Sequence, residues 1–283
     1  MKLVIGSANF LNNYGFNNTK IKSVEIKRIL KFCKNKNIVE IDTSDSYDNF
    51  LKIKNLSFLR LKINTKINFD RSKIFKDSYV ESIINKEFSK LKVLNKRRYN
   101  SILIHNFHTF DKLNEFYRLN EIMNNFKKIG LTKYFGVSIY EKKELKYLTK
   151  FSNLNIIQLP YNLLNKTFSG KILKILNKKY SIHVRSVFLQ GLLLKDFNSL
   201  NKKFKKFKVL KDLQDWIDNQ KLRRMDVMLS ALNKDKKYIN KIIVGIENLN
   251  QLKDINKSLK ERNKVTPKFI SRNSKYIIDP RSW

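Results

Sequence analysis

Short apolar runs alternate with longer amphipathic stretches along the whole chain. Eight of the runs have the length and side-chain types of strands, and they cover residues 3–6, 37–42, 59–67, 101–106, 134–140, 156–162, 182–188 and 241–246. Between most of them, apolar residues recur at three- and four-residue spacing, which predicts helices at 24–34, 78–94, 112–128 and 142–151. Eight alternating strands and helices predict an α/β protein with a parallel (β/α)8 TIM barrel.

Two connections depart from this rhythm. Residues 48–58 leave room for only a short helix, whereas residues 192–240 form a long connection with a basic amphipathic stretch at 202–217. The apolar side of that stretch carries Phe204, Phe207, Leu210, Leu213 and Trp216. We expect this side to pack on the barrel while the lysines extend into solvent, rather than to bind a membrane or nucleic acid. Because the sequence has no linker or internal repeat, residues 1–283 are expected to form one domain.

The composition excludes a disordered chain, because 42% of the residues are hydrophobic and 12% are aromatic. The net charge of +36 would be compatible with a polyanion-binding protein. However, 48 of the 60 basic residues are lysines, and they are spread along the chain together with abundant Asn and Ile. That distribution favours codon bias in an AT-rich genome, so no specific nucleic-acid partner is expected.

A single cysteine, Cys33, excludes an internal disulfide and a zinc cluster of thiolates, and no metal site is expected. Cys33 falls on the apolar side of the predicted helix at 24–34, which favours a core position. No apolar run is long enough for a secretory signal or a membrane span. The sequence therefore predicts a cytoplasmic protein without a membrane partner.

Ionisable residues stand at the ends of three successive predicted strands. Asp42 ends the second strand, Lys66 lies near the end of the third and His105 near the end of the fourth, and Tyr47 follows on the loop after Asp42. Each of them alone has an ordinary structural explanation, such as a helix cap or a core histidine. The carboxyl ends of barrel strands meet at one rim, where catalytic groups lie, so their joint placement predicts a catalytic site.

The four side chains suit the reduction of a carbonyl group. When a hydride reaches the carbonyl carbon, the oxygen gains negative charge and needs a proton or strong hydrogen bonds. Tyr47 would be the general acid, and the Lys66 ammonium would lower the pKa of the phenol from about 10. Asp42 would hold Lys66, and His105 would hydrogen-bond the carbonyl oxygen.

Several longer motifs carry a family resemblance. They are VIGSANF, which includes Gly6, then KKIGLTKYFGVSIY, IIQLPYN, HVRSVFLQGLLL, IVGIENLNQL and the ending IIDPRSW. Together with the Asp, Tyr, Lys and His tetrad, they make nearly the whole chain resemble the aldo-keto reductases. The most similar branch is a bacterial one often associated with cell-surface glycan and sugar-nucleotide gene clusters. The resemblance implies a (β/α)8 oxidoreductase that uses NADP(H) or NAD(H) to reduce a small aldehyde or ketone, and the branch implies a role in carbohydrate metabolism.

The resemblance also implies a cofactor site. Ser138 and Gln158 would hold the nicotinamide carboxamide, and the loop after the seventh strand would lie along the nicotinamide and the pyrophosphate. The turn after the eighth strand would face the adenosine, where Asn248 and Gln251 also have capping-box spacing at a helix N-terminus that suits a phosphate. The residues implied are Gly6, Ser138, Gln158, Arg185, Ser186, Phe188, Leu189, Gln190, Gly245, Asn248 and Gln251.

Four positions depart from the family pattern. Ile139 stands where many members have Asn, Arg185 stands where an aromatic ring often stacks on the nicotinamide, and Asp48 replaces the usual Gly. Glu247 lies close to the place of a basic residue in NADPH-preferring members, and its charge would repel a 2′-phosphate. The choice between NADPH and NADH therefore stays open.

Two further functions also stay open. The altered positions are compatible with a non-catalytic barrel that binds a dinucleotide as a sensor or partner subunit, and the charge is compatible with a polyanion-binding protein. For an enzyme, substrate specificity is expected from the loops at 8–18, 106–111 and 192–202. The sequence identifies neither the substrate nor the oligomeric state.

Overall fold

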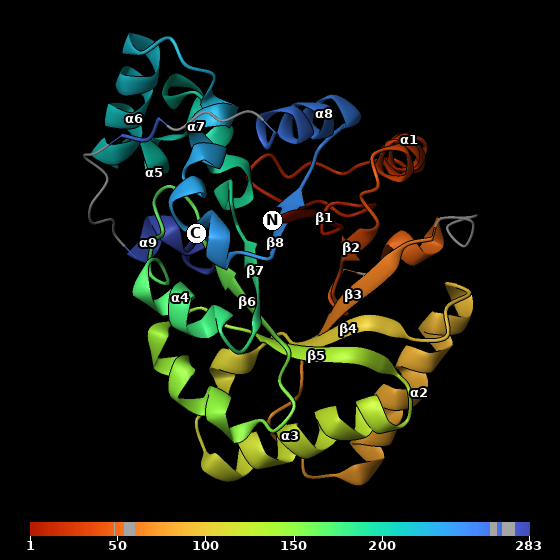
Figure 1. Ribbon diagram of the computed structural model, residues 1–283. Helices are drawn as coiled ribbons and strands as arrows, with labels where there is room; N and C mark the ends of the chain where they lie inside the picture. The colour runs from red at the N-terminus through yellow and green to blue at the C-terminus, as the bar shows by residue number, and fades with distance from the viewer. Residues whose placement is uncertain (48, 54–59, 261–264, 268–274) are drawn as a thin grey trace.

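The computed structural model describes residues 1–47, 49–53, 60–260, 265–267 and 275–283. Eight parallel strands close into a barrel in sequence order, which confirms the predicted fold class (Figure 1). The strands are β1 (Lys2–Gly6), β2 (Glu40–Asp42), β3 (Lys62–Ile67), β4 (Tyr99–Ile104), β5 (Thr132–Ser138), β6 (Ile156–Pro160), β7 (Ser181–Arg185) and β8 (Lys241–Gly245). Most of them end before the apolar runs do, because loops at the barrel mouth take over the last residues.

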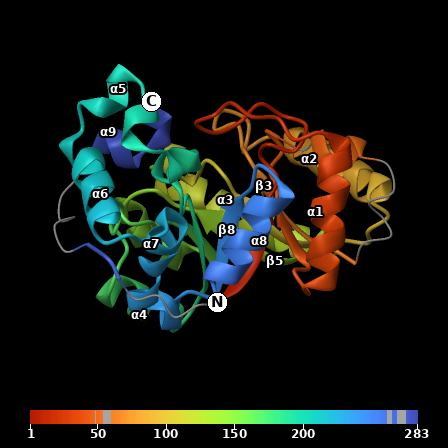
Figure 2. The same cartoon turned by 90° about the horizontal axis from the view of Figure 1, so that it is seen from above.

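Helices surround the barrel, and α1 and α8 lie next to one another on its outside (Figure 2). The α-helices are α1 (Ser23–Asn35), α2 (Asp77–Val93), α3 (Leu113–Lys128), α4 (Lys171–Asn177), α5 (Lys202–Lys205), α6 (Lys208–Asn219), α7 (Arg224–Ser230), α8 (Leu249–Ser258) and α9 (Lys275–Ile278). The predicted helix at 142–151 is instead a 3₁₀ helix, η4 (Lys142–Lys150). Shorter 3₁₀ helices are η1 (Asn49–Lys52), η3 (Phe107–Thr109), η5 (Leu189–Leu194), η6 (Phe197–Ser199), η7 (Asn233–Tyr238) and η8 (Pro280–Ser282).

The basic stretch at 202–217 packs on the body of the protein, as expected, but it is two helices rather than one. The break falls at Phe207, which precedes α6 in an extended conformation. Phe204 is buried and packs edge-on against Phe16 and Trp283, with ring centroids 5.2 and 5.0 Å away. Through Phe204, the connection between β7 and β8 therefore packs against the loop after β1 and against the C-terminus.

The apolar core lies between the barrel and its helices. Helix α1 contributes Ile26, Ile29, Leu30 and Cys33. Cys33 is a free thiol in this core, and burial raises its pKa to about 12, so it remains a protonated thiol at neutral pH. The prediction that Cys33 is a core residue is confirmed.

The inside of the barrel contains several polar and charged side chains. Side chains alternate between the two faces of a strand, so Glu40 and Asp42 on β2 point the same way. Gln158 on β6 donates a hydrogen bond to Asp42 at 2.9 Å, although β2 and β6 are not neighbours. Such a bond can only cross the interior, which places both side chains inside. Near the amino ends of the strands, Lys241 forms a second internal ion pair with Glu40 at 2.7 Å.

The strands β5 and β6 approach each other unusually closely at Gly136. A Cβ built on Gly136 would lie 2.7 Å from the Cβ of Ile156, closer than real side chains come. Only glycine fits this contact, which keeps Ser138 in register with Gln158 two residues further along.

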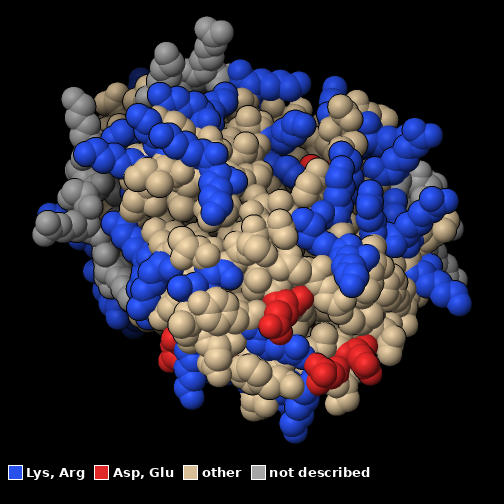
Figure 3. All heavy atoms as spheres, turned by 60° about the horizontal axis from the view of Figure 1, so that its bottom comes forward, with Lys and Arg blue, Asp and Glu red and all other residues tan. Residues whose placement is uncertain are grey.

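The surface is basic without one dominant patch on the face seen in Figure 3, where lysine and arginine side chains are distributed over most of the view. None of the helices in the described part of the chain is long and apolar enough to cross a membrane.

Candidate active site

A buried ion pair stands at the carboxyl end of the barrel. Lys66 donates a short hydrogen bond to Asp42 and a second one, at 2.7 Å, to the backbone carbonyl of Thr43. The Lys66 side chain is 3% exposed and that of Asp42 is 6% exposed. Asp42 also accepts the bond from Gln158, so the lysine and the carboxylate are both held in place.

Tyr47 and His105 lie beside this pair. The Lys66 Nζ lies 5.6 Å from the centroid of the Tyr47 ring, and the ring of His105 stands edge-on to that of Tyr47 at 6.4 Å. The backbone amide of His105 donates to Ile67, which continues the β3–β4 pairing past the end of β4. The structure therefore brings together the four residues that the sequence proposed. Asp48, next to Tyr47, lies outside the described residues.

The electrostatics of Tyr47 differ from the expectation. Burial raises the pKa of Tyr47 well above its ordinary value, the Asp42 carboxylate raises it further, and Arg185 opposes the shift. Burial also lowers the pKa of Lys66, against the attraction of Asp42. Tyr47 is therefore a protonated phenol at neutral pH, able to give a proton to an oxygen that gains negative charge.

His105 is a neutral imidazole. Burial, followed by the charges of Lys66 and Arg185, lowers its pKa to about 3. Its Nδ1 lies 3.0 Å from the hydroxyl of Ser44 and 3.3 Å from the amide nitrogen of Asn68. An amide nitrogen can only donate, so this contact favours the tautomer with the proton on Nε2, ready to donate a hydrogen bond.

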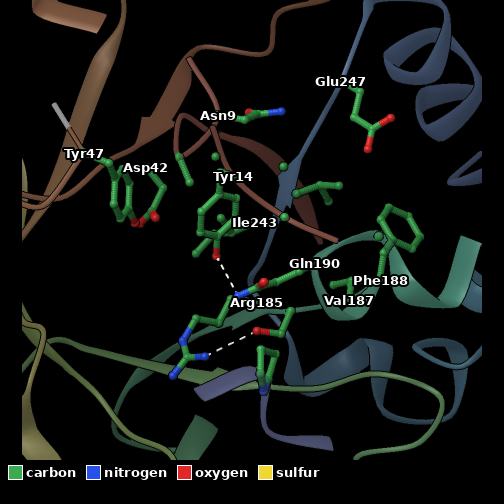
Figure 4. A pocket seen from close by; sticks show the side chains of 18 of the residues that line it. Asn9, Tyr14, Asp42, Tyr47, Arg185, Val187, Phe188, Gln190, Ile243 and Glu247 are labelled. Atoms are coloured by element: carbon green, nitrogen blue, oxygen red, sulfur yellow. Dashed lines mark hydrogen bonds between the residues drawn. The ribbon is translucent and has the colours of Figure 1, made fainter. Parts of the chain in front are cut away.

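A pocket of about 290 Å³ opens above these groups. It extends from the tetrad across the mouth to the end of β8, and Figure 4 shows Glu247 on the opposite side of it from Tyr47 and Asp42. Of the residues proposed for the cofactor, those that line it are Gly6, Gln158, Arg185, Ser186, Phe188, Gln190, Gly245 and Gln251. Ser138 lies behind Gln158, Leu189 is fully buried in the core, and Asn248 caps α8.

Two unpartnered polar atoms fit a carboxamide. Ser138 Oγ and Gln158 Oε1 are buried on paired strand positions, and neither has a hydrogen-bond partner among the described residues. Gln158 lines the pocket, and Ser138 is its partner on the neighbouring strand. A hydroxyl and an amide oxygen left without partners at such positions are matched by a ligand group that both donates and accepts. The nicotinamide carboxamide has this character, so these residues fit that end of the cofactor.

Comparisons with known proteins agree with the fold and identify the family. Residues 2–275 match the profile of the Aldo/keto reductase family. The chain belongs to the aldo/keto reductase family. A solved structure with the same fold is the thermostable aldo-keto reductase Tm1743 in complex with the inhibitor epalrestat, which is 18% identical, with a TM-score of 0.64, 92% of this chain covered and 90% of that one. Another is the aldo-keto reductase AKR11C1 from Bacillus halodurans in its holo form, also 18% identical, with a TM-score of 0.68 and coverages of 92% and 87%. No curated protein matches the chain in sequence.

In this aldo-keto reductase, the loop after β7 has a constrained backbone. Ser186, Leu189 and Gln190 have φ values of 58°, 44° and 55°, in the left-handed region that non-glycine residues avoid. The carbonyl of Gln190 accepts a hydrogen bond from the amide of Phe16 at 2.7 Å. The loop after β1 is thereby held across the pocket, with Tyr14 on its rim (Figure 4).

Several residues that form the wall of the pocket beside Arg185 could not be identified from the sequence. The guanidinium of Arg185 lies 4.0 Å from the centroid of the Tyr140 ring, and that of Arg281 lies 3.6 Å from the same centroid. Arg281 is paired with Asp279 at 2.6 Å. One face of Arg185 therefore contacts Tyr140, and Arg281 reaches the site from the C-terminus, a contact that no local sequence pattern signals. Asn9, Tyr14 and Pro280 also line the pocket.

The N-terminus of α8 differs from the expected phosphate site. The side chain of Asn248 accepts from the amide of Gln251 at 2.8 Å, and that of Gln251 accepts from the amide of Glu247 at 2.7 Å. The amide of Leu249 donates to the carboxylate of Glu25 at 2.7 Å. The capping interaction predicted for Asn248 and Gln251 is present, but three of the amides around the helix start are already occupied.

Proposed function

We propose that this protein is an NAD(P)H-dependent oxidoreductase that reduces an aldehyde or ketone, with Tyr47 as the general acid. The observation that carries the proposal is the buried pair of Asp42 and Lys66 beside the Tyr47 phenol and the neutral His105, in one pocket. Membership of the aldo/keto reductase family supports the same reaction class.

The chain's own residues would divide the work as follows. The reduced nicotinamide supplies the hydride when it is bound. Tyr47 donates its proton to the carbonyl oxygen, and the Nε2–H of His105 fixes the direction of that oxygen by a hydrogen bond. The Lys66 ammonium, held by Asp42, places positive charge beside the phenol and stabilises the phenolate that forms when the proton leaves.

The cofactor would be held along the pocket. Ser138 and Gln158 bind the carboxamide, and the loop after β7 follows the rest of the molecule. The cofactor-binding residues proposed to line the pocket are Gly6, Gln158, Arg185, Ser186, Phe188, Gln190, Gly245 and Gln251. Leu189 and Asn248 act indirectly, through the core beneath the loop and through the cap of α8.

The substrate is proposed to be a small carbonyl compound derived from a sugar. This finer proposal rests on the resemblance of HVRSVFLQGLLL and IIDPRSW to the branch associated with surface-glycan gene clusters. The wall formed by Tyr14, Tyr140 and the C-terminal Arg281 would meet such a substrate, rather than the loop at 106–111.

A non-catalytic dinucleotide-binding barrel is the alternative. It is favoured by the raised pKa of Tyr47, because a phenol that holds its proton strongly is a weaker acid. Binding of NADH or NADPH without reduction of any compound in a broad panel of aldehydes and sugars would favour this alternative.

Replacing Tyr47 by phenylalanine tests the proposal. We expect Tyr47→Phe to lower kcat for a reducible aldehyde by about 10²- to 10⁴-fold, because positioned acid catalysis contributes that much. Steady-state kinetics measure the rate, and quenching of protein fluorescence measures cofactor binding, which should persist. Tyr117→Phe, on the exposed side of α3, is the matched control. If Tyr47→Phe keeps the full rate, the proposed acid is wrong.

A further inference from the structure

We propose that Glu247 makes this pocket select NAD(H) and reject NADP(H). The inference rests on the proposed function in one respect, namely that the pocket holds a nicotinamide dinucleotide. It goes further by assigning the discrimination between the two cofactors to one carboxylate at the end of the pocket away from the tetrad.

The direction of the dinucleotide follows from the chemistry of the two ends. Gln158 lines the pocket and donates a hydrogen bond to Asp42 of the tetrad, and Ser138 is paired with Gln158 on the neighbouring strand. The unpartnered Gln158 Oε1 and Ser138 Oγ therefore mark the tetrad end, where the nicotinamide must lie for its hydride to reach a carbonyl beside Tyr47. The adenosine then extends toward the other end, which is formed by the end of β8 and the start of α8. Glu247 lies there, and Figure 4 shows it across the pocket from Tyr47.

The charges lining the pocket are divided between its ends. Lys66 belongs to the tetrad, and Arg185 and Arg281 both contact the ring of Tyr140 at the barrel mouth. At the β8 end, Glu247 is the charged side chain among the described residues that line the pocket. Although the chain has 60 basic and 24 acidic residues, the part of this lining that the structure describes offers a phosphate one carboxylate and no cation.

The carboxylate of Glu247 is held in position. Asn17, from the loop after β1, donates a hydrogen bond to its Oε1 at 2.7 Å. The backbone of the loop after β7 lies against it, since a Cβ added to Gly191 would come within 3.8 Å of the same oxygen. These neighbours on two sides restrict the movement of the Glu247 side chain, so it cannot easily turn away from a negatively charged group.

Three amides at the start of α8 are not free to compensate for that charge. A helix N-terminus attracts phosphate through its free amides and its dipole. Here the amide of Leu249 is bound to the Glu25 carboxylate, and those of Glu247 and Gln251 are bound to side chains. Glu25 is itself paired with Arg28 at 2.9 Å, whereas the described side-chain contact of Glu247 is the neutral amide of Asn17, so Glu247 is the carboxylate that would meet a 2′-phosphate.

A carboxylate suits the unphosphorylated ribose. It can accept a hydrogen bond from the 2′-hydroxyl of NAD(H), a common arrangement in nucleotide-binding proteins. Against a 2′-phosphate the same carboxylate places like charges side by side, which costs enough to weaken binding on the order of 100-fold. The prediction is therefore a large difference in affinity in favour of NADH.

The test is a fluorescence titration of the full-length protein with NADH and with NADPH. Wild type is expected to bind NADH about 100-fold more tightly. Glu247→Gln should lower the ratio of the NADPH Kd to the NADH Kd at least 10-fold, chiefly because NADPH binds more tightly. Glu247→Lys should bind NADPH more tightly than NADH. Glu81→Gln, on the exposed surface of α2, is the matched control and should keep the wild-type ratio.

Adenosine fragments give a second readout that does not depend on catalysis. Calorimetric titration with AMP and with adenosine 2′,5′-bisphosphate should reproduce the preference for the compound without the 2′-phosphate. Equal or tighter binding of NADPH by wild type, an unchanged ratio in Glu247→Gln, or no binding of either dinucleotide by folded protein would overturn the proposal. Selective NADH binding without carbonyl reduction would support the proposal while contradicting the proposed function.

Discussion

Two carboxylate–lysine pairs lie inside the same barrel, and their carboxylates are two residues apart on β2. Glu40 binds Lys241 near the amino ends of the strands, and Asp42 binds Lys66 near the carboxyl ends. In the first pair, Glu40 also accepts a hydrogen bond from the side-chain amide of Asn64 at 3.0 Å. The second pair adjoins a phenol, an imidazole and a pocket. The two ion pairs are thus of the same kind but have different surroundings. One lies among polar side chains near the amino ends of the strands, and the other lies beside the proposed active site.

The difference shows why position on the strand matters more than residue type. Strand periodicity directs both carboxylates into the barrel. Only the carboxyl ends of the strands are followed by the loops that bring Tyr47 and close the pocket. We therefore expect the Glu40–Lys241 pair (the lower pair) to act on stability alone, and the Asp42–Lys66 pair (the upper pair) to act on the proposed chemistry as well.

The largest expected effect comes from breaking the upper pair. Lys66→Met removes the positive charge beside Tyr47, and we expect kcat to fall by about 10²- to 10⁴-fold. The uncompensated Asp42 should also lower the stability of the fold. The double variant Asp42→Asn with Lys66→Met should recover stability in urea unfolding but not the rate. Recovery of both would mean that the pair is only structural.

A smaller effect, and a different one, is expected from breaking the lower pair. In Lys241→Met, Glu40 keeps its hydrogen bond from the Asn64 amide, and the side chains of Lys241 and Glu40 are 17% and 11% exposed in the wild type. The free energy of unfolding should therefore fall by about 3 kcal/mol, near the lower end of the usual range for breaking a buried ion pair. Urea unfolding measures this loss. The kcat of the folded fraction should stay close to that of wild type. A loss of rate as large as that of Lys66→Met would remove the distinction between the pairs.

The smallest effect at neutral pH concerns His183, whose pKa responds to the lysines of both pairs. Burial, followed by the charges of Lys241 and Lys66, lowers its pKa to about 3. The unfolded chain takes up a proton near pH 6.5 that the folded protein does not, so this histidine lowers stability as the pH falls from about 6.5 toward 3. His183→Gln should make that decline shallower by up to about 1.4 kcal/mol per pH unit. Unfolding curves between pH 7 and pH 4 measure it, and an unchanged slope would contradict the assignment.

Much of the fold and the tetrad could be predicted from the sequence, because both depend on local periodicity. Eight apolar runs specify eight strands, and the ends of parallel strands meet, so Asp42, Lys66 and His105 had to lie close together. The pairing of Asn17 with Glu247 and the stacking of Arg281 on Tyr140 could not be predicted. They join segments that are far apart in the chain and depend on the conformations of loops and side chains.

The direction in which the pKa of Tyr47 is shifted also could not be predicted from the sequence. The neighbouring lysine suggested a lowered value, but burial and the Asp42 carboxylate act in the opposite direction and prevail. A list of neighbouring residues gives the signs of the charges. It does not give the degree of burial, which decides the balance here.

The most direct test of a carbonyl-reducing site is to follow the hydride. The purified protein is incubated with NADH that carries deuterium on the transferable position of C4, together with an aldehyde from the panel. Mass spectrometry of the product should find one deuterium on the carbinol carbon, with one NADH consumed per alcohol formed. A folded protein that binds the cofactor but transfers no deuterium to any aldehyde or ketone would contradict the account.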